Sequence, residues 1–257
     1  MNKKYINNEI YTDPDFYNDI MWWKKDDIQF WKHIINTNKS KTVLELCCGT
    51  GRIGFPLIES GIDYYGIDSS QSFIDFFHGQ ASKQKYDISK IHCTDIRNFN
   101  IKKSFDLILI GFNSLAHLLT NQDLLDTLKA IKLHMHSETI FAIDIFVPDV
   151  SFLYRDNQDK LNIMDFIHSK TNEQLNILES INYNSLTEIN RVNWDFMDKD
   201  NISKFHYSFD MRMWFPDTLN RMLTDCNYHI HKFYGDYDCS IFNTDSEKQI
   251  YLCKKYI

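Results

Sequence analysis

The stretch Val43-Leu-Glu-Leu-Cys-Cys-Gly-Thr-Gly-Arg-Ile-Gly54 decides the fold of this chain. Its apolar beginning is typical of a strand covered on both faces, and one carboxylate, Glu45, interrupts it. The glycines that follow, Gly49, Gly51 and Gly54, have the spacing G-x-G-x-x-G. This spacing lets a ligand approach the backbone closely where a strand turns into a helix. The stretch therefore predicts a strand, a ligand-binding turn and a helix; a tight turn without a ligand is the alternative.

Strand and helix patterns alternate along the chain on either side of this stretch. Strands that alternate with helices form a parallel sheet, so we expect an α/β, doubly wound, Rossmann-like domain. After one more helical pattern, at 217–226, the chain ends with two strand patterns. The predicted strands are 42–47, 63–67, 91–94, 105–110, 139–147, 228–234 and 249–254.

The alternation stops after Pro148. Between 175 and 214, three stretches carry the two-residue alternation of strands without helices between them, and the polar run 198–201 predicts a turn. This pattern indicates an antiparallel β insertion. The predicted division is a helical, aromatic-rich segment at 1–40, the α/β domain at 41–149 and 215–257, and the insertion at 150–214.

The composition narrows the class of protein. Of the 257 residues, 43% are hydrophobic, which argues against disorder. The formal net charge of −7 argues against a nucleic-acid partner, which favours a basic patch. The longest apolar run, Leu107–Phe112, is far shorter than the roughly 20 residues that cross a bilayer. Because residues 1–15 carry no apolar signal segment, we expect a cytoplasmic protein without a membrane partner.

Metal and disulfide chemistry have little support in the sequence. None of the six cysteines forms a C-x-x-C pair, so we expect reduced thiols. Two histidine pairs, His134-x-His136 and His229-x-His231, have a spacing that can bind metal, but no acidic cluster accompanies them. We expect surface histidines and no metal.

Two carboxylates accompany the glycine turn. Glu45 lies inside the apolar strand, where a charged group is costly unless it has a partner. Asp68 ends the second strand, where an acid can accept hydrogen bonds from both hydroxyls of a ribose. Asp68 suits a dinucleotide and S-adenosylmethionine (SAM) equally well. Glu45 favours SAM, because that ligand lacks a pyrophosphate and carries two cationic groups.

These residues resemble motifs of a known family. Residues 45–53 (ELCCGTGRI) and 66–70 (GIDSS) resemble the first two motifs of class I SAM-dependent methyltransferases. His92–Arg97 resembles the third motif, and Phe105–Leu119 resembles the fourth with its following loop. A late loop, Tyr234–Asp238, is similar to one in the small-molecule branch of the superfamily, which is methyltransferase domain 25-like.

The resemblance implies a seven-stranded, mostly parallel sheet whose last strands are antiparallel, with SAM as cofactor. It implies methyl transfer to a nitrogen or an oxygen of a small molecule. Residues 1–40 would form a helical lid, and the insertion 150–214 would roof the acceptor pocket or pair through an exposed edge into a homodimer. A NAD-type dinucleotide-dependent oxidoreductase and a methyltransferase of macromolecules remain as alternatives. The Pro-Pro motif of enzymes that methylate amino groups of nucleic acids is absent, and Gly111–Ser114 stands in its place.

The same resemblance assigns site residues. His117 is the candidate general base, with a surface position as the alternative. Core packing is the alternative for the aromatic residues of the N-terminal segment. The predicted cofactor contacts are Tyr17, Glu45, Cys47, Gly49, Gly51, Arg52, Asp68, Ser69, Asp95, Ile96, Arg97, Phe112 and Asn113. The predicted acceptor-pocket residues are Tyr11, Trp22, Arg191, Trp194, Asp236 and Asp238.

Overall fold

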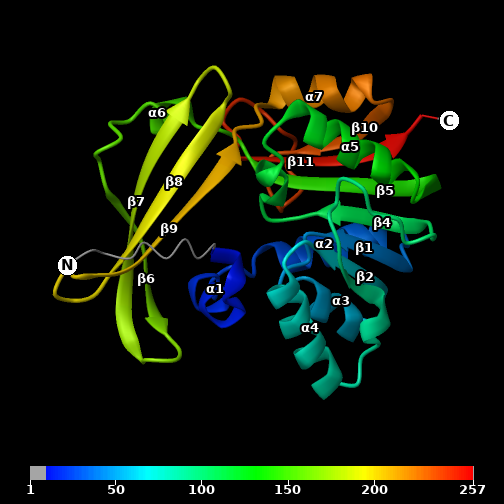
Figure 1. The fold of residues 1–257 in the computed structure, drawn as a ribbon. Helices are drawn as coiled ribbons and strands as arrows, with labels where there is room; N and C mark the ends of the chain where they lie inside the picture. Colours follow the sequence, from blue (N-terminus) through cyan, green and yellow to red (C-terminus); the bar gives the residue numbers. More distant parts are fainter. Residues whose placement is uncertain (1–9, 257) are drawn as a thin grey trace. The chain divides into compact units, whose positions relative to one another are not determined.

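The structure, a computed structural model, describes residues 10–256 and contains two compact units. We call residues 25–148 and 214–256 the α/β unit, and residues 10–24 and 149–213 the antiparallel unit. Figure 1 shows the elements of both units.

The α/β unit is built on a seven-stranded sheet of order β10-β11-β5-β4-β1-β2-β3. Strands β1 to β5 pair in parallel, and β11 pairs antiparallel with both β5 and β10. The expected sheet with its antiparallel end is confirmed. The strands are β1 Thr42–Leu46, β2 Asp63–Asp68, β3 Ile91–Cys93, β4 Phe105–Ile110, β5 Met135–Phe146, β10 Tyr228–Tyr234 and β11 Lys248–Lys255.

Two helices of the α/β unit, α4 and α5, begin at side-chain caps. The Ser70 hydroxyl accepts a hydrogen bond from the backbone N–H of Phe73, and Thr120 with Asp123 forms a capping box. Phe77 is fully buried in the cluster that one face of the sheet forms with α2, α3 and α4, and such a side chain stabilises the fold by roughly 1.5–3 kcal/mol. The helices are α2 Asp27–Thr37, α3 Gly54–Glu59, α4 Gln71–Lys83, α5 Asn121–Lys132 and α7 Pro216–Asp225, with 3₁₀ turns at Ile88–Lys90 and Ser114–His117.

The antiparallel unit is a four-stranded sheet of order β6-β7-β8-β9, so the expected antiparallel insertion is present. Its first strand was not predicted. A register shift between Asn162 and Met164 breaks the two-residue alternation there, and the pattern therefore gives no strand signal. The strands are β6 Leu161–His168, β7 Glu173–Asn184, β8 Ile189–Met197 and β9 Ser203–Arg212, preceded by the short helix α6 Val150–Leu153.

The N-terminal segment, expected as one lid over residues 1–40, is divided between the two units. The 3₁₀ turn Ile10–Thr12 and helix α1, Pro14–Ile20, belong to the antiparallel unit, where Phe16 packs against Phe196 with ring centroids 5.1 Å apart. Helix α2 belongs to the α/β unit, because its apolar face, including the fully buried Trp31, packs into the sheet cluster. The first nine residues of the predicted lid lie outside the described residues.

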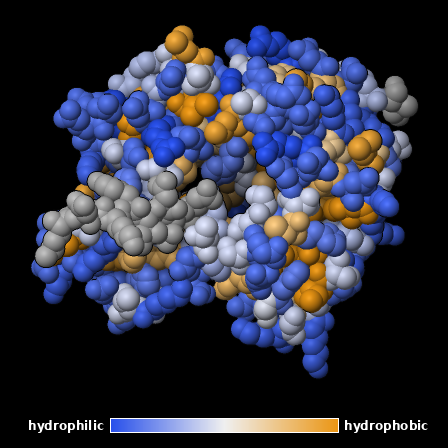
Figure 2. All heavy atoms as spheres, in the orientation of Figure 1, coloured by the Kyte–Doolittle hydropathy of each residue, from blue (hydrophilic) through white to orange (hydrophobic). Residues whose placement is uncertain are grey.

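The described helices and the surface have the following character. No helix within residues 10–256 is long and apolar enough to span one. Hydrophilic residues predominate on the face in Figure 2, and hydrophobic residues lie there in separate patches.

All six cysteines are free thiols.

Candidate active site

The turn after β1 has a backbone that glycine favours. Cys47, Gly49 and Gly51 all have positive φ, at 60°, 55° and 94°. A Cβ on Gly51 would lie 2.6 Å from the Phe77 ring and 2.7 Å from that of Phe55, so no side chain fits there. A Cβ on Gly49 would meet no atom closer than 3.8 Å. The turn is therefore packed tightly beneath Gly51 and open at Gly49, where a ligand can approach the backbone.

Asp68, the last residue of β2, ties two loops together. Its Oδ2 accepts a hydrogen bond from the backbone N–H of Gly49 at 2.9 Å, and its Oδ1 accepts one from Ser70 at 2.8 Å. Burial raises the pKa of this carboxyl, and the backbone donors oppose that shift. Each carboxylate oxygen can accept a further hydrogen bond, so Asp68 remains able to bind ribose hydroxyls. Ser69, beside it, is exposed.

Glu45 lies buried in β1, as the sequence predicts. The Tyr64 hydroxyl donates a hydrogen bond to its Oε2 at 2.6 Å. Burial raises the pKa of Glu45 to about 8, because desolvation disfavours the charged form. Arg52 lowers this pKa, whereas Asp27 and Asp68 raise it further. A cation that reaches Glu45 would favour its ionised form.

Arg52 is bound by an acid that the sequence analysis missed. Its Nη1 and Nη2 donate to the two carboxylate oxygens of Asp27 at 2.6 and 2.8 Å, and the Asp27 side chain is fully buried. The guanidinium also lies 4.9 Å from the ring centroid of Phe112. Asp27 was not predicted as a site residue, because an acid in the first turn of a helix such as α2 usually needs no partner beyond the helix dipole.

A second missed acid, Asp144, holds the loop after β4. Its Oδ2 accepts hydrogen bonds from the backbone N–H of Phe112 at 3.1 Å and from the hydroxyl of Tyr237 at 2.9 Å. Phe112 and Asn113 both have positive φ, at 50° and 63°, and the Asn113 side chain accepts a hydrogen bond from Phe146. Asp144 could have been found as Glu45 was, because it interrupts the apolar run of β5.

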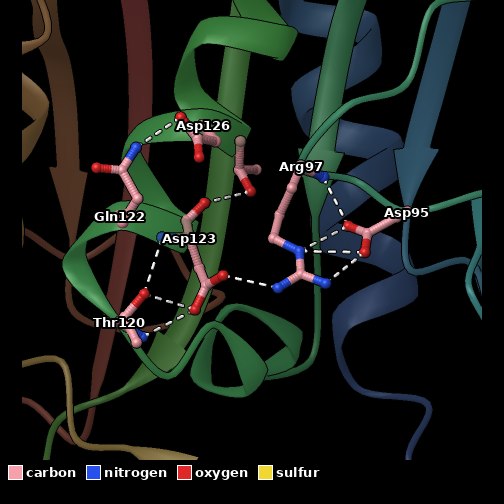
Figure 3. Close-up of polar contacts among 7 residues, drawn as sticks. Asp95, Arg97, Thr120, Gln122, Asp123 and Asp126 are labelled. Atoms are coloured by element: carbon pink, nitrogen blue, oxygen red, sulfur yellow. Dashed lines mark hydrogen bonds and ion pairs between the residues drawn. The ribbon is translucent and has the colours of Figure 1, made fainter.

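Asp95 and Arg97, predicted to frame the adenine, follow β3 and form an ion pair (Figure 3). The Arg97 Nη2 lies 2.6 Å from Asp95, and its Nη1 lies 2.7 Å from Asp123, which caps α5. The Arg97 guanidinium lowers the pKa of Asp95 by hydrogen bonding. Ile96, between them, is buried. This network links the loop after β3 to the start of α5.

Three further predicted residues of the α/β unit are exposed. His117 is the last residue of the 3₁₀ turn Ser114–His117. Asp236 forms an ion pair with Lys248 at 3.0 Å, and Asp238 accepts a hydrogen bond from the backbone N–H of Ser240. The half-buried residue of that loop is Tyr237, between the two predicted acids.

Other predicted acceptor residues belong to the antiparallel unit. Arg191 lies on one face of the sheet and pairs with Asp210, whereas Trp194 lies on the other face and donates to Glu179. Because alternate residues of a strand point to opposite faces, Arg191 and Trp194 lie on opposite faces of this sheet. Trp22 is 61% exposed. Tyr11 and Tyr17 contact each other, with ring centroids 5.9 Å apart.

No group of three or more His, Cys, Asp or Glu side chains in the described part of the chain could hold a metal ion. The residues that the structure does bring together are Glu45, Asp68 and the glycine turn, with Asp27 and Arg52 beside them. A cluster with an excess of acids suits a ligand that carries a sulfonium and an ammonium. The donor set therefore fits SAM.

Comparisons with known proteins agree with SAM as the ligand of this site. Residues 43–138 match the family model described as a methyltransferase domain. The chain is 23% identical over 222 residues to "Putative methyltransferase YqeM" of Bacillus subtilis (strain 168), with 83% of each chain covered. It is 22% identical over 237 residues to the glycine/sarcosine N-methyltransferase of Aphanothece halophytica, with 88% of this chain and 81% of that one covered. A SAM-dependent methyltransferase structure from Clostridium acetobutylicum ATCC 824 matches with a TM-score of 0.75 and 20% identity, covering 93% of this chain and 96% of that one.

Residues 43–138 form a methyltransferase domain, and the fold is that of a SAM-dependent methyltransferase. The chain is a SAM-dependent methyltransferase, and SAM is its cofactor. The alternative of a dinucleotide-dependent oxidoreductase is set aside, because the methyltransferase domain spans the glycine turn on which that alternative depended.

Proposed function

We propose that this enzyme transfers the methyl group of SAM to a nitrogen atom of a small molecule. The observation that carries the proposal is the set of buried acids at or near the carboxyl ends of β1, β2 and β5, namely Glu45, Asp68 and Asp144, together with Asp27. Arg52 neutralises Asp27. The other acids favour cations, and Glu45, whose pKa is raised to about 8, would ionise beside one. The N-methylated product of an amine is a cation. The similarity to a glycine/sarcosine N-methyltransferase supports a small amine as acceptor.

The residues around the glycine turn would hold the cofactor. Bound SAM supplies a methyl group on a positively charged sulfur. Glu45 and the turn from Cys47 to Gly51 would bind the methionine end, and Asp68 with Ser69 would bind the ribose. The loop from Asp95 to Arg97 would frame the adenine, and Phe112 with Asn113 would border the methyl group at the end of β4. Tyr17, in the N-terminal segment, is the remaining proposed cofactor contact.

A nitrogen acceptor fits these groups better than an oxygen acceptor. A neutral amine attacks without a base, whereas a hydroxyl must lose its proton during the transfer. His117 remains the candidate base for an oxygen acceptor. If nitrogen is the acceptor, His117→Ala should leave kcat within about threefold of the wild type; a loss of about a hundredfold would favour oxygen.

Labelled methyl transfer tests the function directly. The purified chain is supplied with SAM labelled in its methyl group and with matched amines and alcohols, and the products are analysed by mass spectrometry. We expect label on nitrogen. Asp68→Asn, which disturbs the ribose contact, should lower kcat/KM for SAM by about ten- to a hundredfold, whereas Asp63→Asn at the opposite end of β2 should not. Label on a hydroxyl, a protein or an RNA would contradict the proposal.

The predicted homodimer remains a proposal as well. Strand β6 is an edge of the four-stranded sheet, and Leu161 and Ile167 on it are 42% and 62% exposed. Light scattering on the purified protein should report a dimer that Ile167→Lys dissociates. A cytoplasmic location is likewise still a prediction.

A further inference from the structure

A tyrosine that was not predicted as a site residue lies against Glu45 inside the α/β unit. Tyr64 is the second residue of β2 and is 3% exposed, and its hydroxyl donates to Oε2 of Glu45 at 2.6 Å. Burial raises the pKa of Tyr64 well above its usual range, so the phenol keeps its proton and remains a donor. The distance is in the short range of a hydroxyl that donates to an ionised carboxylate.

Two glycines leave the space that the phenol occupies. A Cβ on Gly54 would lie 2.7 Å from both Cζ and the hydroxyl oxygen of Tyr64, and a Cβ on Gly66 would lie 3.1 Å from that oxygen. Gly66 lies directly across from Glu45 in the register of β1 and β2. Gly54 and Gly66 do not have positive φ, so what each supplies is space. The third glycine of the G-x-G-x-x-G spacing therefore makes room for Tyr64.

Packing fixes the orientation of the Tyr64 ring. The ring stacks with that of Phe77, with centroids 6.2 Å apart and planes inclined by 12°. Phe77 is fully buried, and its ring lies 2.6 Å from where a Cβ on Gly51 would be. Tyr64 and the glycine turn are thus packed against the same aromatic side chain. The phenol cannot turn away from Glu45 without disturbing the packing beneath the turn.

Glu45 responds to the charges around the site. Burial raises its pKa, the Tyr64 hydrogen bond and the Arg52 charge lower it, and the charges of Asp27 and Asp68 raise it further. The groups that interact electrostatically with Glu45 are Tyr64 and Asp68 of β2, Cys47, Cys48 and Arg52 of the turn, and Asp27 of α2. Its neighbour on β4, Leu109, is apolar. A cationic ligand at the glycine turn would act on Glu45 as Arg52 does, and such an action needs no direct contact.

We propose that Tyr64 is a positioning residue of the cofactor site, whose hydroxyl holds the Glu45 carboxyl in place and favours its ionised form, so that Glu45 is charged when SAM is bound. This role rests on the proposed cofactor role of Glu45 and not on the identity of the methyl acceptor. Loss of the phenol should therefore weaken SAM binding only where Glu45 must lose a proton as SAM binds, which is below its pKa of about 8.

SAM affinity at two pH values, measured by calorimetry, tests the proposal without any turnover. Tyr64→Phe deletes only the hydroxyl. A hydrogen bond to a charged group corresponds to about one pH unit or more, so we expect SAM to bind about tenfold more weakly than to the wild type at pH 7, but within about threefold at pH 9. Tyr65→Phe is the matched control, because the Tyr65 hydroxyl accepts from Lys103, and it should match the wild type at both pH values. An equal loss at both pH values in Tyr64→Phe, or no loss at either, would overturn the proposal.

The same substitution in a Glu45→Gln background tests whether Tyr64 acts through Glu45. The glutamine cannot ionise, so Tyr64→Phe should change SAM affinity there by less than about twofold at pH 7. A tenfold loss in that background would show that the phenol acts on the fold instead, and would overturn the proposal. If Glu45→Gln alone leaves SAM affinity and its pH dependence unchanged, the cofactor role of Glu45 fails with it. Labelled methyl transfer reports on the proposed acceptor separately.

Discussion

Tyr64 and Glu45, on neighbouring parallel strands, share a buried hydrogen bond of 2.6 Å between phenol and carboxyl. The pKa of Glu45 is raised to about 8, and a cationic ligand would lower it. Binding of SAM near pH 7 should therefore release a proton. Isothermal titration calorimetry in two buffers of different ionisation enthalpy should give different apparent enthalpies, and affinity should increase as pH rises toward 8.

Glu45→Gln is the control for this proton release, since it should remove the difference between the buffers. The effect of rising pH on the stability of the ligand-free protein is opposite to its effect on SAM affinity. Because burial raises the pKa of Glu45 above its unfolded value, the folded protein without ligand binds more protons and loses stability as pH rises from about 4.5 to about 8. Equal enthalpies in both buffers would contradict the ionisation of Glu45 on binding.

Asp68→Asn should weaken SAM binding by about ten- to a hundredfold, because a charge-assisted hydrogen bond to the ribose contributes about 1.5–3 kcal/mol. Calorimetry with SAM measures the change. Asp63→Asn is a matched control at the other end of the same strand, where the carboxylate pairs with Lys90 and Lys103. Similar losses of affinity in the two variants would show that Asp68 has no specific role.

Asp27→Asn should lower the free energy of unfolding by about 2–4 kcal/mol, because it leaves Arg52 without its bidentate partner next to buried acids. Urea denaturation measures this loss. The exposed pair of Lys170 with Asp13 offers the comparison, and Lys170→Met should change stability by less than about 1 kcal/mol. A loss in Asp27→Asn no larger than in Lys170→Met would contradict a structural role for the Arg52 pair.

Tyr237→Phe should reduce kcat by about tenfold with little change in SAM affinity. The variant removes one donor from Asp144, which also accepts the backbone N–H of Phe112 beside the expected methyl position. Steady-state kinetics and calorimetry separate the two effects. Tyr234→Phe, three residues earlier on β10, should leave kcat unchanged. If SAM affinity falls as much as kcat, Tyr237 acts on cofactor binding instead.

Gly51→Ala should destabilise the chain by about 3 kcal/mol, because its Cβ would overlap the rings of Phe77 and Phe55 at a φ of 94°. Gly79→Ala should do the opposite. Gly79 lies within α4 with no atom within 4 Å of a built Cβ, so alanine there should add about 0.5–1 kcal/mol. Thermal unfolding of both variants checks the contrast, and equal melting temperatures would contradict it.

Features that depend on neighbouring residues could be predicted from the sequence. The apolar runs of β1 and β4 and the glycine turn define the parallel sheet, because strand and turn preferences act over a few residues. Glu45 and Asp68 were found because an acid inside or at the end of an apolar strand stands out locally. Strand β6 was not predicted, because a bulge interrupts the two-residue alternation of its side chains.

Features that depend on partners far along the chain were decided by the tertiary structure. Asp27 meets Arg52, and Asp144 meets Tyr237, across separations of 25 and 93 residues. Two buried nitrogens of the Arg155 guanidinium, Nε and Nη1, have no acceptor among residues 10–256, and only the packed structure shows this. The partner of a buried charge is chosen by the fold as a whole, because desolvation and pairing depend on every element that packs around it.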